Sequence, residues 1–129
     1  MKKGVFLVFV GALLLCGCQT PNSKSYLNGY RIAYSPNSLF NEETIAFEFK
    51  DALHRKANLR LGIKETDTYS ENDKIIYLKV DDTLEEGQYS IEKAGKSFLF
   101  SSDSVSGINE ACHDFLNKCR NSKDGLNEW

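Results

Sequence analysis

The sequence predicts an α+β fold in which a small mixed β-sheet of about five strands is covered by two helices. Five short runs rich in apolar and β-branched residues, each bounded by turn-forming residues, are typical of strands. Two longer stretches repeat apolar residues at helical spacing. Their order along the chain is strand, helix, several strands and helix, which favours an α+β arrangement of layers.

Residues 1–17 have the pattern of a signal peptide that directs export. Lys2 and Lys3 form a positive start, and residues 4–15 form an apolar stretch of the length that signal peptides use. This stretch is too short to span a bilayer as a helix. We therefore expect residues 1–17 to be removed; an ordinary secretory peptide or an uncleaved anchor are the alternatives.

The end of this segment resembles the lipobox of bacterial lipoproteins. Leu15 is the aliphatic residue three places before Cys18, and Gly17 is the small residue directly before it. Cys16 stands where alanine or serine is usual, but it is also small. The resemblance implies that lipoprotein signal peptidase recognises Leu15 and Gly17, and that Cys18 becomes lipidated. Acyl chains such as palmitate would then anchor an extracytoplasmic protein to the bacterial cell membrane or the outer membrane.

The composition beyond the signal segment bounds the protein's partners. Removal of residues 1–17 leaves 112 residues, enough for one small domain. This part carries 14 basic and 18 acidic residues, so its formal charge is about −4, and it has no basic stripe. We therefore expect no nucleic-acid partner and membrane attachment through lipid alone.

The first half of the mature chain predicts a tether, a strand and a helix. Residues 18–28 are polar and turn-forming, so they read as the lipidated cysteine and a flexible tether. The α+β domain is expected over residues 29–120, beginning with a strand at residues 30–34. In that strand Tyr30, Ile32 and Tyr34 alternate with Arg31 and Ala33.

The helix that follows has a plausible N-cap in Asn41 and acidic residues in its first turn. Its expected core face holds four apolar residues: Ile45, Phe49, Ala52 and Leu53. Phe47 falls nearly opposite that face, so we expect it to be exposed.

The second half predicts four strands and one helix. The strands are expected at residues 60–66, 74–80, 88–93 and 97–101, with a hairpin turn at residues 94–96 where Gly95 tolerates a positive φ. The helix presents one apolar stripe: Ile108, Ala111, Cys112, Phe115, Leu116 and Cys119. Residues 121–129 read as a polar tail.

Residues 73–119 resemble the small N-terminal domain that precedes the catalytic barrel in family 20 β-hexosaminidases and in related α-glucuronidases. The matching residues pack strands and helices or form turns: Tyr89, Ile91, Gly95, Phe98, Phe100, Gly107, Phe115 and Leu116. Residues 101–106 replace a glycine pair and an arginine of the family pattern. The resemblance implies a non-catalytic domain, because the family's catalytic acid and assisting aspartate lie in the barrel, which needs a couple of hundred more residues.

No pattern of catalytic or metal-binding residues stands out. The family's small domain is similar in fold to zinc metalloproteases, but the first helix reads His54-Arg55-Lys56-Ala57-Asn58 and holds no His-Glu-x-x-His. His54 and His113 fall on the solvent sides of their helices. The paired acids at residues 81–82 and 85–86 could form a glycosidase pair only around a sugar-binding cleft, and they read as a solvated loop. We expect no catalytic site, metal or cofactor, and the sequence leaves the ligand-binding residues open.

Cys112 and Cys119 lie seven positions apart in one predicted helix. A rise of about 1.5 Å per residue separates them by roughly 10 Å, which is too far for a disulfide bond within an intact helix. We interpret them as buried thiols, with a redox or metal role as the alternative.

These observations favour a lipid-anchored, non-catalytic binding or interaction module of the cell envelope, linked to glycan handling through its relatives. One alternative is the accessory subunit, or a remnant, of a split glycoside hydrolase. Another is a small lipoprotein that protects or inhibits an envelope component. A protein or glycan partner is expected in each case.

Overall fold

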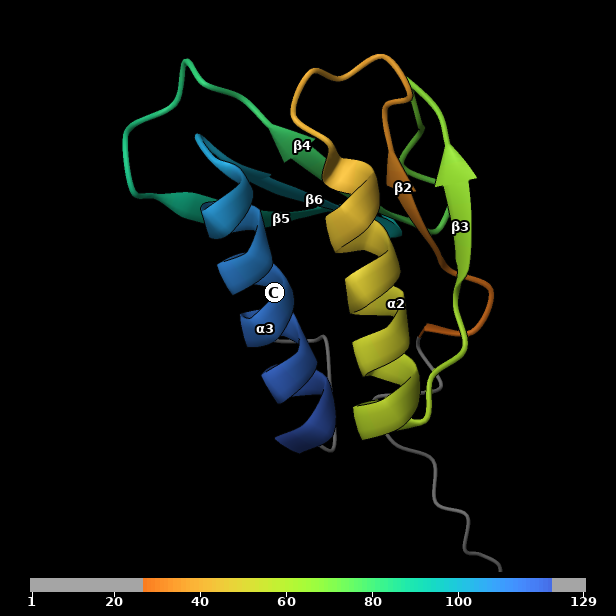
Figure 1. Ribbon diagram of the computed structural model, residues 1–129. Helices are drawn as coiled ribbons and strands as arrows, with labels where there is room; N and C mark the ends of the chain where they lie inside the picture. The colour runs from red at the N-terminus through yellow and green to blue at the C-terminus, as the bar shows by residue number, and fades with distance from the viewer. Residues whose placement is uncertain (1–26, 122–129) are drawn as a thin grey trace, which may run out of the picture.

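A mixed five-stranded sheet forms one layer of the protein (Figure 1). The computed structural model describes residues 27–121. The strand order is β3-β2-β4-β6-β5, in which the first four strands run parallel and β5 pairs antiparallel with β6 at one edge. The strands are β2 (Arg31–Tyr34), β3 (Gly62–Glu65), β4 (Ile75–Val80), β5 (Tyr89–Ala94) and β6 (Ser97–Ser102).

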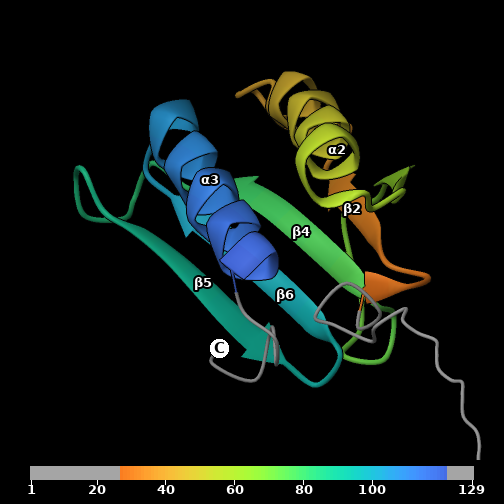
Figure 2. The same ribbon diagram turned by 90° about the horizontal axis from the view of Figure 1, so that it is seen from below.

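Two helices form the second layer and lie side by side on one face of the sheet (Figure 2). Helix α2 (Glu42–Ala57) connects the parallel strands β2 and β3, which a tight turn cannot join. Helix α3 (Val105–Asn121) follows β6. The expected α+β fold, with two helices covering a sheet of five strands, is therefore confirmed.

The predicted strands are all present, and their ends differ from the expected ones by at most two residues. The hairpin between β5 and β6 turns at Gly95, which has a φ of 61° as the sequence predicts. The first strand pairs in register with both neighbours, since Ile32 lies opposite Ile63 of β3 and Ile76 of β4.

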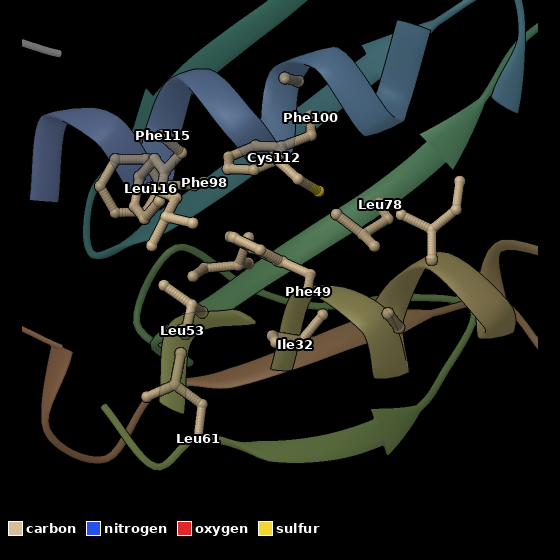
Figure 3. Packing of buried hydrophobic residues seen from close by; sticks show 14 of the residues in the cluster. Ile32, Phe49, Leu53, Leu61, Leu78, Phe98, Phe100, Cys112, Phe115 and Leu116 are labelled. Carbon is tan, nitrogen blue, oxygen red and sulfur yellow. The ribbon is translucent and has the colours of Figure 1, made fainter. Parts of the chain in front are cut away.

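The main core lies between the sheet and the helices (Figure 3). Its centre is aromatic: the ring of Phe115 on α3 lies 5.2 Å from the rings of Phe98 and Phe100 and 6.2 Å from that of Phe49 on α2. Leu53 and Leu78 pack into the same cluster. The apolar stripes predicted for both helices are thus the faces that build the core, while Phe47 is exposed as expected.

A smaller cluster covers the opposite face of the sheet. Ala33, Ile75 and Tyr77 are buried there, and Tyr69 and Leu99 pack against them. The strict alternation expected for β2 is therefore incomplete, because Ala33 is fully buried although it is off the helix-facing side. The segment between β3 and β4 carries Tyr69 onto this face, which shields it from solvent.

The domain boundaries need small corrections. Leu27, expected at the end of the tether, is fully buried in the main core, so the domain begins two residues earlier than predicted. Helix α3 extends to Asn121, one residue into the predicted tail. Leu15, Gly17 and Cys18, and residues 122–129, lie outside the described residues. Within residues 27–121, neither helix is long and apolar enough to cross a membrane.

Asn41 holds the N-cap position of α2, but not in the expected way. Its backbone is left-handed, with a φ of 60°, a conformation that asparagine tolerates. Its side chain makes no capping hydrogen bond to the helix backbone and donates instead to the Thr44 hydroxyl at 3.1 Å.

Candidate functional site

A pocket of about 670 Å³ opens at the carboxyl ends of β2 and β4. Strand β2 pairs with β4 only as far as Ala33 opposite Tyr77, whereas β4 continues along β6 to Val80. The last three residues of β4 therefore have no strand beside them on the β2 side. The chain leaves β2 towards β3 on one side and leaves β4 towards β5, which lies beyond β6 on the other side. In open sheets with parallel strands, ligands bind at such switch points.

Glu42, the first residue of α2, lines this pocket and also a smaller one beside it. Its side chain is only 3% exposed, and Oε2 accepts a hydrogen bond of 2.9 Å from the backbone N–H of Val80. The carboxylate thus accepts the Val80 N–H at a position where β2 no longer pairs with β4. Its other oxygen, Oε1, is buried without a hydrogen-bond partner among the described residues.

Glu42 was not predicted as a site residue, since its place in the first turn was expected only from the favourable charge of an acidic residue there. A signal was present, because Glu42 precedes Ile45 by three residues and Phe49 by seven, which is the spacing of the buried face. A charged residue at a core position of a helix marks an unusual environment.

The outer wall of the pocket joins the loop after β2 to the loop after β3. The Ser35 hydroxyl donates to Asp67 Oδ1, and the side-chain amide of Asn37 donates to Asp67 Oδ2 at 2.7 Å. Both carboxylate oxygens of Asp67 are therefore engaged by side chains of the neighbouring loop. These bonds hold the two loops together at the mouth of the pocket.

Aromatic rings form another wall. Tyr69 and Tyr77 stack with ring centroids 4.9 Å apart and an interplanar angle of 26°, and Tyr77 donates its hydroxyl hydrogen to the Thr66 carbonyl at 2.8 Å. Burial raises the pKa of both phenols, so they stay neutral near pH 7. At the rim, the Leu39 side chain is 93% exposed.

Tyr34 links the ends of β2 and β3 next to the pocket. It ends β2 and donates a hydrogen bond of 2.9 Å to Glu65 Oε2 at the end of β3. Burial, this hydrogen bond and the charges of Glu43 and Glu65 raise the pKa of Tyr34 to about 12. The proton therefore remains on Tyr34 throughout the physiological range, and the bond that links the two strand ends persists.

The acids singled out in the sequence lie outside this pocket. Asp81 accepts hydrogen bonds from the Thr83 backbone N–H at 3.0 Å and from its hydroxyl at 2.6 Å, and these bonds lower the pKa of Asp81. Asp82, Glu85 and Glu86 are exposed. The exposure of Asp82, Glu85 and Glu86 agrees with a solvated loop, whereas Asp81 is half-buried.

The two histidines are also where the sequence predicts them. His54 and His113 are both exposed on their helices. Within the part of the chain that the structure describes, no three His, Cys, Asp or Glu side chains are grouped so that they could hold a metal ion.

Cys112 and Cys119 are buried thiols on α3, as predicted, and neither is in a disulfide bond. Burial raises the pKa of the Cys119 thiol to about 12 and raises the pKa of Cys112 as well. Both therefore remain protonated near neutral pH, which disfavours nucleophilic or redox reactivity.

The fold has solved counterparts among glycoside hydrolases. The GH20 exo-β-N-acetylglucosaminidase of Vibrio harveyi, solved in complex with N-acetylglucosamine, is similar at 15% identity and a TM-score of 0.52. The likeness covers 90% of this chain and 20% of that one, and an inactive mutant of the same enzyme gives the same values. The chain thus shares the fold of one part of a larger enzyme.

A GH138 enzyme targeting pectin rhamnogalacturonan II also matches, at 17% identity and a TM-score of 0.48 over 68% of this chain and 13% of that one. No protein-family model and no curated protein matches the chain.

Proposed function

We propose that the protein is a lipid-anchored, non-catalytic binding module of the bacterial cell envelope that acts in glycan handling. The observation that carries the proposal is the pocket at the ends of β2 and β4, which combines aromatic rings with carboxylate and hydroxyl groups. Pockets of about 300–1,000 Å³ with this mixture of surfaces are typical of small-ligand sites. The fold, shared with one part of a GH20 enzyme, supports a role beside glycan chemistry.

The same features favour binding over hydrolysis. Glycoside cleavage by paired acids needs two carboxyl groups held at a fixed separation around the sugar, one of them free to give a proton. In the pocket, Asp67 is bonded through both oxygens, and Glu42 holds the Val80 N–H. The paired acids at residues 81–82 and 85–86 are not among the residues that line the pocket, and all but the half-buried Asp81 are exposed.

A second candidate function is that of an accessory subunit of a split glycoside hydrolase. The chain spans 20% of the length of the GH20 enzyme that it resembles, so a catalytic barrel on a separate chain would complete such an enzyme. An adjacent reading frame that encodes a barrel would favour this function. Co-purification of that barrel with the protein from detergent-solubilised membranes would test it.

The membrane anchor is tested by a Cys18→Ser substitution. We expect the unchanged protein to fractionate with membranes and to carry diacylglycerol on Cys18, because Leu15 and Gly17 meet the requirements of the lipoprotein peptidase. The variant should lose the lipid and leave the membrane fraction or accumulate as unprocessed precursor. Intact-mass spectrometry checks both proteins.

Cys16→Ser is the matched control, since it changes the neighbouring cysteine and keeps the recognition residues. It should be processed and lipidated like the unchanged protein. An unmodified N-terminus elsewhere in the unchanged protein would contradict the anchor.

A further inference from the structure

Resting on the proposed function, we infer that the pocket binds a single sugar unit whose hydroxyl or amino group donates a hydrogen bond to Glu42 Oε1. The sugar would lie against the stacked rings of Tyr69 and Tyr77. The inference concerns the ligand of the pocket at the ends of β2 and β4, and it assigns Glu42 as the residue that recognises the ligand.

The first step is the unpaired oxygen of Glu42. A buried carboxylate oxygen without a hydrogen-bond donor is unfavourable, and such groups are rare in folded proteins. The Glu42 side chain is 97% buried, since its exposed fraction is 3%, and it lines the pocket. Its partner Val80 serves only Oε2. Because Oε1 is itself closed off from solvent, a ligand donor would have to displace part of the pocket lining to reach it, and would then supply the missing hydrogen bond.

The second step is the balance of donors and acceptors along the wall. The Ser35 hydroxyl hydrogen is used by Asp67, and the Tyr77 hydroxyl hydrogen is used by the Thr66 carbonyl. The Ser38 hydroxyl oxygen accepts from the Phe40 backbone N–H at 3.1 Å. The Ser38 hydroxyl keeps its own hydrogen, and Thr68 and Tyr69 bring further hydroxyl groups to the lining. The wall therefore offers both donors and acceptors beside the unpaired Glu42 oxygen and the Lys79 ammonium at the rim. Such a wall suits a ligand whose groups both donate and accept hydrogen bonds, such as a polyol.

The third step is the apolar part of the wall. Tyr69 is half-buried with one ring face against Tyr77, and Leu39 and Leu99 line the same pocket. A pyranose ring has an apolar C–H face and a rim of hydroxyl groups, so it matches both surfaces at once. A flexible polyamine would match the acidic groups but would leave the aromatic wall uncovered.

The test is a titration of the detergent-solubilised full chain with glucose and with glucosamine, followed by saturation-transfer NMR. These probes differ only in the group on C2, so they separate a hydroxyl donor from an ammonium donor. We expect saturable binding of at least one of them. Glu42→Gln should weaken that binding at least tenfold, because the amide cannot serve both Val80 and a ligand donor as an acceptor.

Glu43→Gln is the matched control, because Glu43 is the next residue, is exposed and does not line this pocket. It should leave the affinity unchanged. Tyr69→Leu provides a second pocket variant that keeps the buried carboxylate, and it should also weaken binding. If circular dichroism shows that Glu42→Gln does not fold, the Tyr69→Leu variant decides whether the inference holds.

The outcomes separate the inference from the proposed function. Sugar binding that is unaffected by a folded Glu42→Gln variant and by Tyr69→Leu would overturn the inference while leaving a glycan-binding module. Absence of binding to both probes would also overturn the inference. If the chain then binds none of the oligosaccharides on a glycan array, the proposed function fails as well.

Discussion

Replacement of Phe115 by alanine is expected to lower the free energy of unfolding by about 3–5 kcal/mol. Phe115 is fully buried on α3, and its ring contacts three other aromatic rings, from Phe49, Phe98 and Phe100. The substitution removes these contacts and leaves a cavity between the two helices and the sheet. Urea unfolding of the full chain in detergent, followed by circular dichroism, measures the loss.

Phe47→Ala is the matched control, because it deletes the same ring from a helix position that is 49% exposed. Its effect should stay within about 0.5 kcal/mol, as for most surface substitutions. Equal losses for the two variants would show that the aromatic cluster is not the centre of the core.

Replacement of Gly107 by alanine is expected to destabilise the protein by a net ~1–2 kcal/mol. A Cβ atom at this position would lie 1.8 Å from the Ser102 Oγ and 2.6 Å from the Ser102 Cβ. The first turn of α3 and the end of β6 would therefore have to move apart, and overpacking of this kind costs about 1–3 kcal/mol or more. The strain outweighs the roughly 1 kcal/mol by which alanine favours a helix over glycine.

A double-mutant cycle with Ser102→Gly tests this explanation, because that change removes both clashing atoms. Ser102→Gly alone also loses the hydrogen bond from Oγ to the Gln88 carbonyl. The stability of the double variant is therefore compared with that of Ser102→Gly and not with that of the unchanged protein. In its presence, Gly107→Ala should cost nothing or should stabilise the helix. An equal cost in both backgrounds, measured by urea unfolding, would contradict the steric explanation.

Periodicity was sufficient to predict the elements of this fold. The alternation of Tyr30, Ile32 and Tyr34 and the helical spacing from Ile108 to Cys119 directly encode which face is buried, so both predictions are confirmed. The second cluster was not predictable in this way. Ala33 is buried because Tyr69 crosses the far side of the sheet, and such a long-range contact leaves no local pattern.

The pocket depends on strand register, which local sequence patterns do not encode. It exists because β2 stops pairing with β4 at Tyr77 while β4 continues to Val80. The length of each strand could be predicted within two residues, but a difference of three residues between neighbours falls close to that error. The burial of Leu27 was not predicted either, because a single apolar residue among polar ones forms no periodic pattern.

The most direct test of a non-catalytic binding role is an assay of the purified protein with aryl N-acetylglucosaminides and aryl glucuronides. We predict no turnover above the uncatalysed rate, because Asp82, Glu85 and Glu86 are exposed, Asp81 is hydrogen-bonded to Thr83 and both oxygens of Asp67 are engaged. The contrary result is turnover that is abolished by neutral substitutions of Asp81, Asp82, Glu85 or Glu86, or by Glu42→Gln. That result would show that the protein is an enzyme.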